Sequence, residues 1–167
     1  DGPLLVVDAI SGLGGAHFRL DDWGVDVAVT GSQKCLMSPP GLAFIALGTR
    51  GLQRVEPIDT PRYYFDLRKY VHRLPETPYT PAVPLLRAVD TALDLIFEES
   101  LEKVFDRHRL LREMVRAGVR ALGLSPWTDD RFASPTLTAV ACPDGVDAEA
   151  VRAAMRDEYG VEIGGGQ

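Results

Sequence analysis

Three short, mostly apolar runs in the first part of the chain constrain its fold more than any other feature. They are LLVV at residues 4–7, VDVAVT at 25–30 and LAFIAL at 42–47. A run of this length, bounded by polar or turn-forming residues, is typical of a strand buried on both faces of a sheet, as in α/β proteins. We therefore predict an α/β fold that begins with part of a parallel or mixed sheet.

After the proline-rich residues 75–84 the spacing of apolar residues changes from two to about 3.6, which predicts helices. The first predicted helix has Thr80 as its N-cap and Pro81 at its first helical position. The second follows Ser100 directly and ends at Gly123, a residue suited to the left-handed conformation after a helix. The apolar face of the first helix consists of Leu86, Val89, Leu93, Ile96 and Phe97.

The last part of the chain is predicted to form a small α+β unit. Residues 136–141 and 161–163 have the composition of strands, and Asp147 is a suitable N-cap for a helix between them. The chain begins directly in an apolar run and stops just after a strand-like segment. We therefore expect it to be part of a longer protein.

The composition argues against several classes of protein. An apolar content of 46% with 25% charged residues is that of a soluble globular protein, and a formal net charge of −6 argues against binding to nucleic acid or to an anionic membrane. No apolar run approaches the ~18 residues of a membrane helix. Cys35 and Cys142 lack a metal-binding spacing and are expected to be reduced thiols, so we expect a cytoplasmic protein without a metal site.

Asp8 and Lys34 are the best candidates for residues that act in catalysis. Asp8 ends the first predicted strand, and Lys34 follows the second, so both could face one cleft at the carboxyl edge of the sheet. A lysine amine attacks a carbonyl once it has lost its proton, and a carboxylate beside a pyridine nitrogen keeps that nitrogen protonated. Pyridoxal phosphate uses both groups. Each residue also has a simpler explanation, as a surface lysine or as an aspartate that caps a turn.

Several segments of the chain resemble one family of enzymes. They are VDAISGLGG at residues 7–15, DWGVD at 22–26, GSQK at 31–34, PPG at 39–41 and EIGGG at 162–166. With the interval between Asp8 and Lys34 (34 − 8 = 26 positions), they closely resemble the class V aminotransferases. Within that family the resemblance is to the alanine–glyoxylate and serine–pyruvate (serine–glyoxylate) enzymes, and it covers nearly the whole chain.

The resemblance implies a fold-type-I pyridoxal-phosphate enzyme. Residues 1–100 would be the C-terminal part of its large, cofactor-binding domain, and residues 101–167 would be an incomplete small domain. The implied reaction is transamination, in which alanine or serine gives its amino group to glyoxylate or pyruvate. The implied assembly is a homodimer whose cofactor site is shared across the interface.

Five residues match positions that bind the cofactor in this family. By resemblance, Lys34 would form the Schiff base with pyridoxal phosphate and later move the proton at the substrate Cα, while Asp8 would pair with the pyridinium nitrogen. Ile10 would pack on one face of the ring. Gln33 would lie next to the phosphate, and Thr80 would reach across the dimer interface to the phosphate of the partner subunit.

Two other interpretations stay open at this point. One is another class V enzyme, such as a cysteine desulfurase-like lyase; those enzymes place a histidine before the lysine, and Gln33 at that position favours the aminotransferase. The other is a non-catalytic dimerisation or interaction module. The family's glycine-rich phosphate turn, its stacking aromatic residue and its substrate-binding arginine have no match in residues 1–167, so we expect this stretch alone to be inactive.

Overall fold

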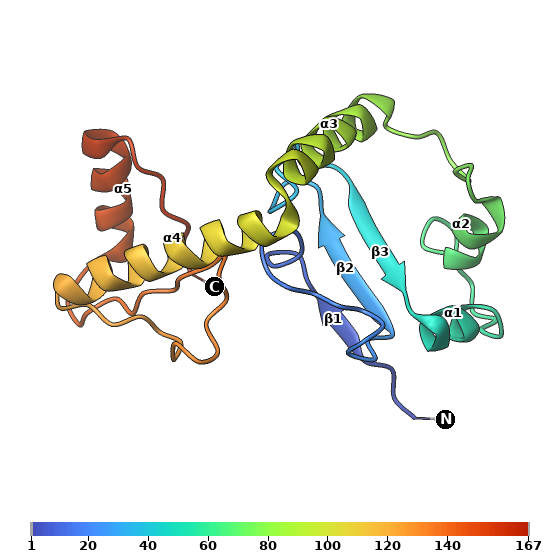
Figure 1. Ribbon diagram of the computed structural model, residues 1–167, viewed down its shortest axis with the longest axis horizontal. Coiled ribbons are helices and arrows are strands. Elements are labelled where there is room, and N and C mark those ends of the chain that lie inside the picture. Colours follow the sequence, from blue (N-terminus) through green and yellow to red (C-terminus); the bar gives the residue numbers. More distant parts are fainter. Residues whose placement is uncertain (1, 167) are drawn as a thin grey trace. The chain divides into compact units, whose positions relative to one another are not determined.

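The computed structural model describes residues 2–166, which form two compact units, the first ending at Phe105 and the second beginning at Asp106. Figure 1 labels the strands and helices. In chain order they are β1 (Val6–Asp8), β2 (Val27–Gly31), β3 (Ala43–Leu47), α1 (Thr49–Val55), α2 (Leu67–Arg73), α3 (Val83–Glu99), α4 (Leu101–Ala121) and α5 (Ala148–Tyr159). The assignment of residues 1–100 and 101–167 to a large and a small domain stays a prediction.

The sheet of the first unit is mixed, as predicted. β2 lies between the other two strands, parallel to β1 and antiparallel to β3. Asp8 is in register with Val29, and Gly31 with Ala43. The prediction that residues 4–7 are buried on both faces is wrong, since Val6 is 60% exposed. β1, like β3, is an edge strand of this sheet, so one of its sides has no neighbouring strand among the described residues.

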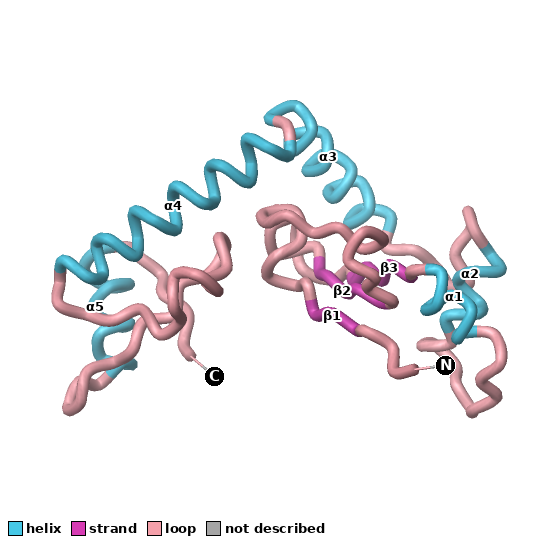
Figure 2. Tube along the Cα trace, turned by 60° about the horizontal axis from the view of Figure 1, so that its bottom comes forward, coloured by secondary structure: helices cyan, strands magenta, loops and turns pink. Residues whose placement is uncertain are grey.

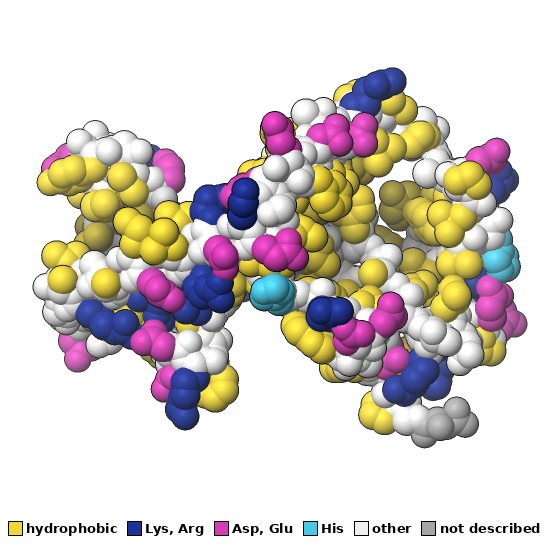
Figure 3. Space-filling view, viewed as in Figure 1, with side chains coloured by type: hydrophobic (Ala, Val, Ile, Leu, Met, Phe, Trp, Pro, Cys, Tyr) yellow, Lys and Arg dark blue, Asp and Glu magenta, His cyan; other side chains and the backbone are white. Residues whose placement is uncertain are grey.

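The hydrophobic core of the first unit joins the sheet to the region where α3 ends and α4 begins. Leu36, Ile96 and Val104 are its buried centre, and Leu13, Phe44, Leu93 and Leu101 pack against them. Figure 2 shows α3 beside the sheet. Apolar side chains also remain at the surface over α3 and the neighbouring strands (Figure 3).

The predicted start of α3 is wrong. Its N-cap is Ala82 instead of Thr80, and Pro84 instead of Pro81 lies in its first turn. Pro84 suits this place because the first N–H groups of a helix have no partner within the helix, so its missing N–H costs nothing. The buried face of α3 is also narrower than predicted, because Phe97 is 64% exposed.

The helices predicted after residue 100 are present, but the predicted strands are not. α4 ends at Ala121, and Gly123 has a φ of 77°, in the left-handed region. The Asp147 side chain caps α5 by accepting hydrogen bonds from two backbone N–H groups. Residues 136–141 and 161–163 form no strand, and a single bridge between Pro126 and Val140 takes the place of a ladder.

None of the helices within residues 2–166 combines the length and the apolar composition that crossing a bilayer requires.

Candidate active site

Two loops leave the same edge of the sheet and carry most of the predicted site residues. β1 and β2 are parallel, and the Ala9 N–H donates to the Val29 carbonyl over 2.9 Å, so their pairing continues past Asp8. The chain then turns, because the N–H groups of Gly12 and Leu13 both donate to the Ala9 carbonyl. This edge is where open α/β sheets bind ligands.

Asp8 presents an exposed carboxylate at this edge. Its Oδ1 atom accepts a hydrogen bond of 2.9 Å from the Ile10 N–H, which fixes the side chain against its own loop. No other hydrogen bond to Asp8 is made within residues 2–166, so Oδ2 can still accept one from a ligand. Ile10 itself is half-buried.

The second loop, residues 32–42, carries Lys34 and Gln33, and both side chains are exposed. A turn follows Lys34, since its carbonyl accepts a hydrogen bond of 2.9 Å from the Met37 N–H, and Met37 adopts a left-handed φ of 54°. Gln33 folds back over the strand end. A Cβ atom at Gly31 would lie 2.8 Å from Gln33 Oε1, so a larger residue at position 31 would displace the Gln33 side chain from this position.

The two loops contact each other next to Lys34. The Cys35 thiol donates to the Ser11 carbonyl over 3.5 Å. A Cβ atom added at Gly14 would lie 3.4 Å from Cys35 Cβ, so the loops approach closely. Partial burial raises the pKa of the Cys35 thiol, and the Lys34 charge opposes this shift. The structure thus brings the Asp8 and Lys34 loops together, as the sequence suggested.

Thr80 is the predicted site residue that lies apart from these loops. It is exposed and precedes the N-cap of α3 by two residues. No hydrogen bond joins it to the Asp8 loop or the Lys34 loop within the described part of the chain.

An aromatic cluster beside Thr80 was missed by the sequence analysis. The rings of Tyr63, Tyr64, Tyr70 and Tyr79 lie 5.0–6.2 Å apart, and the Lys69 ammonium lies 4.7 Å from the centre of the Tyr63 ring. The dense spacing of aromatic residues around positions 63–79 is the signal that could have found it.

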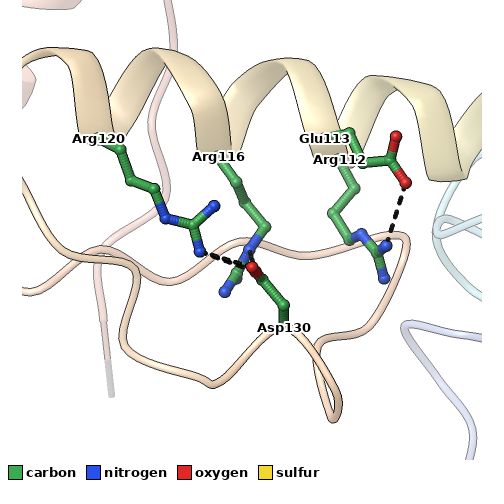
Figure 4. Close-up of a pocket in the computed structure, with 5 residues that line it drawn as sticks. All are labelled: Arg112, Glu113, Arg116, Arg120 and Asp130. Atoms are coloured by element: carbon green, nitrogen blue, oxygen red, sulfur yellow. Dashed lines mark hydrogen bonds and ion pairs between the residues drawn. The ribbon is translucent and has the colours of Figure 1, made fainter.

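A pocket of about 310 Å³ in the second unit was also missed. It is lined by Arg112, Glu113, Arg116, Arg120 and Asp130 (Figure 4). Arg116 is only 3% exposed and donates to the Asp130 carboxylate over 2.6 Å. Arg120 and Arg116 together hold the pKa of Asp130 below its usual range. Since these charges satisfy one another, we interpret the network as an anchor between α4 and the Asp130 loop. The recurrence of arginine every four residues along α4 was its sequence signal.

The groups at the sheet edge suit one kind of ligand. Lys34 offers an amine to an aldehyde, Asp8 offers a carboxylate oxygen to a protonated ring nitrogen, and Gln33 offers an amide to a phosphate. Within residues 2–166 no group of three or more histidine, cysteine, aspartate and glutamate side chains is arranged to hold a metal ion. The donor set therefore fits pyridoxal phosphate.

Comparison with known proteins gives a consistent result. Residues 1–167 match the family described as aminotransferase class-V. A Synechococcus sp. protein named "Soluble hydrogenase, small subunit" is 41% identical over 166 residues, which are 98% of this chain and 43% of that protein. The serine–glyoxylate aminotransferase of Arabidopsis thaliana is 40% identical over 166 residues, which are 96% of this chain and 41% of the plant protein.

The similarity extends to solved structures. The crystal structure of an alanine–glyoxylate aminotransferase from Nostoc sp. has a TM-score of 0.88 and 34% identity, covering 98% of this chain and 45% of that one. The predicted family resemblance and the fold-type-I α/β architecture are confirmed. The chain spans less than half the length of these relatives.

Proposed function

We propose that this chain, which belongs to the class V aminotransferases, carries the cofactor-binding lysine of a pyridoxal-phosphate-dependent transaminase. One observation carries the proposal. Asp8 is the last residue of β1 and the Lys34 loop follows the parallel strand β2, so both lie at the same edge of the sheet, and the loop after Asp8 contacts the Lys34 loop through Ser11 and Cys35. When bound, pyridoxal phosphate supplies an aldehyde for a lysine amine and a protonated ring that withdraws electrons from the substrate Cα.

Each site residue has one task in this proposal. The Lys34 amine holds the cofactor and, once released, moves a proton at the substrate Cα. The Asp8 carboxylate keeps the proton on the ring nitrogen, while Ile10 packs on one face of the ring. Gln33 binds near the phosphate, and Thr80 binds the phosphate in the partner subunit.

The substrates, assembly and location belong to the same proposal. The Arabidopsis and Nostoc relatives bear the names of serine–glyoxylate and alanine–glyoxylate aminotransferases, which supports a small amino acid as donor and glyoxylate or pyruvate as acceptor. The distance of Thr80 in sequence from the Lys34 loop, and its exposure, suit a role toward a second subunit of a homodimer. We place the protein in the cytoplasm.

Reductive trapping tests the proposal in the full-length protein, meaning this chain with any segments that precede or follow it. Borohydride treatment of the protein loaded with pyridoxal phosphate should fix the cofactor on Lys34, as located by peptide mass spectrometry. Lys34→Ala should abolish both the trapped product and transamination with serine or alanine plus glyoxylate. Lys103→Ala is the control, because this exposed lysine of α4 lies outside the site.

Trapping at Lys103 or at no lysine would contradict the proposal. A Lys34→Ala variant that keeps full activity would favour the non-catalytic module instead. Conversion of cysteine to alanine, with its sulfur released as sulfide only when a thiol reductant is added, and without transamination, would favour a desulfurase-like lyase.

A further inference from the structure

Ser32 is the most completely buried polar residue that the reaction does not use. Its exposed fraction is 0%, and it stands two residues before Lys34. Its hydroxyl donates to the Pro39 carbonyl over 2.7 Å and accepts from the Leu42 N–H over 3.3 Å. A single side chain thus ties the beginning of the Lys34 loop to its end.

The backbone of Ser32 makes the same connection. Its N–H donates to the Leu42 carbonyl over 3.1 Å, and its carbonyl accepts from the Ser38 N–H over 2.9 Å. Pro39 and the following proline have no N–H groups, so neither can donate a backbone hydrogen bond that would hold this part of the loop. A hydroxyl can donate and accept at once, so the Ser32 side chain adds a donor for the Pro39 carbonyl and an acceptor for the Leu42 N–H to these backbone bonds.

We propose that Ser32 is a positioning residue that sets the direction of the Lys34 side chain by closing residues 32–42 at their base. Two fixed points define the path of the backbone through Lys34. One is the pair of hydrogen bonds that the Ser32 hydroxyl makes with the Pro39 carbonyl and the Leu42 N–H, which we call the Ser32 clasp. The other is the turn in which the Met37 N–H donates to the Lys34 carbonyl. Without the hydroxyl, the Pro39 carbonyl and the Leu42 N–H each lose a partner, and the loop gains freedom. This proposal rests on the proposed function, since it concerns the lysine that holds the cofactor.

The chain offers a matched control in the same loop. Ser38 is also buried, at 8% exposure, but its hydroxyl has no hydrogen-bond partner within the described residues. Ser32→Ala and Ser38→Ala remove the same atom from similarly buried places, and only the first removes hydrogen bonds. A difference between the two variants therefore reports on the clasp and not on burial.

The experiment uses the full-length protein with and without pyridoxal phosphate. Hydrogen exchange measured by mass spectrometry should show amides of residues 33–42 exchanging about tenfold faster in Ser32→Ala, with β2 unchanged. The apparent affinity of the cofactor-free protein for pyridoxal phosphate should fall by about three- to tenfold. The pH midpoint of the bound cofactor's visible absorbance should shift, because it depends on how the lysine is held. Ser38→Ala should match the wild type in all three measurements.

Ser32→Ala with an unchanged pH midpoint, or Ser38→Ala with the same shift, overturns the proposal. If Ser32→Ala does not fold, Ser32→Cys keeps the shape with a weaker hydrogen-bonding group, and an unshifted midpoint in that variant also overturns it. The proposed function fails separately, when the wild-type protein itself attaches no cofactor at Lys34.

Discussion

Replacing Gly51 by alanine tests how closely α1 approaches the sheet. Gly51 is buried on the side of α1 that faces the residues just before β2. A Cβ atom at this position would lie 2.1 Å from the Asp26 carbonyl oxygen and 3.1 Å from the Asp26 carbonyl carbon. The same carbonyl accepts a hydrogen bond of 2.9 Å from the Gly48 N–H, so it is held in place at the start of the helix.

The expected cost follows from these distances. An ordinary carbon–oxygen contact is about 3.3 Å, so α1 would have to move away by roughly 1 Å. Such overpacking costs ~2 kcal/mol, and weakening the Gly48–Asp26 hydrogen bond adds ~1 kcal/mol. The higher helix propensity of alanine offsets ~1 kcal/mol of this destabilisation. The net loss for Gly51→Ala is therefore about 2 kcal/mol, which corresponds to a fall of roughly 4–8 °C in the melting temperature if about 150–250 residues unfold together.

Gly118→Ala in α4 is the matched control. It is the same glycine-to-alanine substitution inside a helix, but apart from its chain neighbours and the helix's own backbone the added Cβ atom would have no atom within 4 Å. It should raise stability by about 0.5–1 kcal/mol, through helix propensity alone. Urea denaturation of the full-length protein, followed by circular dichroism at the helix band, measures both variants. Equal stability of the two variants would refute the close contact between α1 and the Asp26 carbonyl.

Two further predictions concern charged groups. Asp130→Asn should lower the urea midpoint more than Asp129→Asn, because Asp130 neutralises the buried Arg116, whereas the ion-pair partner of Asp129 is exposed; equal effects would argue against the anchor between α4 and the Asp130 loop. The Arg68 guanidinium holds the pKa of Asp66 at about 2, below an unfolded value of about 3.9. This stabilisation is present above the unfolded pKa and is lost as pH falls through about 2, so an NMR titration of the Asp66 carboxyl with a midpoint near its ordinary value would contradict the ion pair.

The sheet and the long helices could be predicted because their sequence patterns are local. β2 and β3 differ from the predicted residues 25–30 and 42–47 by no more than two positions at either end. The shared sheet edge of Asp8 and Lys34 followed from the same pattern, since β1 ends at Asp8 and Lys34 lies three residues beyond the end of β2; their role in binding a cofactor stays a prediction. The parallel pairing of β1 with β2 then fixed which loops meet.

The short helices α1 and α2 were missed because they depend on tertiary contacts and have no clear local sequence pattern. α1 and α2 have seven residues each, too few to be stable without packing, and Gly51 lowers the helix propensity of α1 further. The Ser32 clasp could not be predicted from the sequence either. A serine in a loop is usually an exposed polar residue. Only the folded structure shows that the Pro39 carbonyl and the Leu42 N–H are hydrogen-bonded to the Ser32 hydroxyl.

The packing of Leu13 and Leu36 has a consequence for how this site can be changed. Leu13 comes five residues after Asp8 and Leu36 two residues after Lys34, yet both belong to one apolar cluster with Ile96. Exchanging either segment alone for that of another enzyme would leave a mismatched partner beneath it. The two segments are therefore a single engineering module, to be grafted together or left alone.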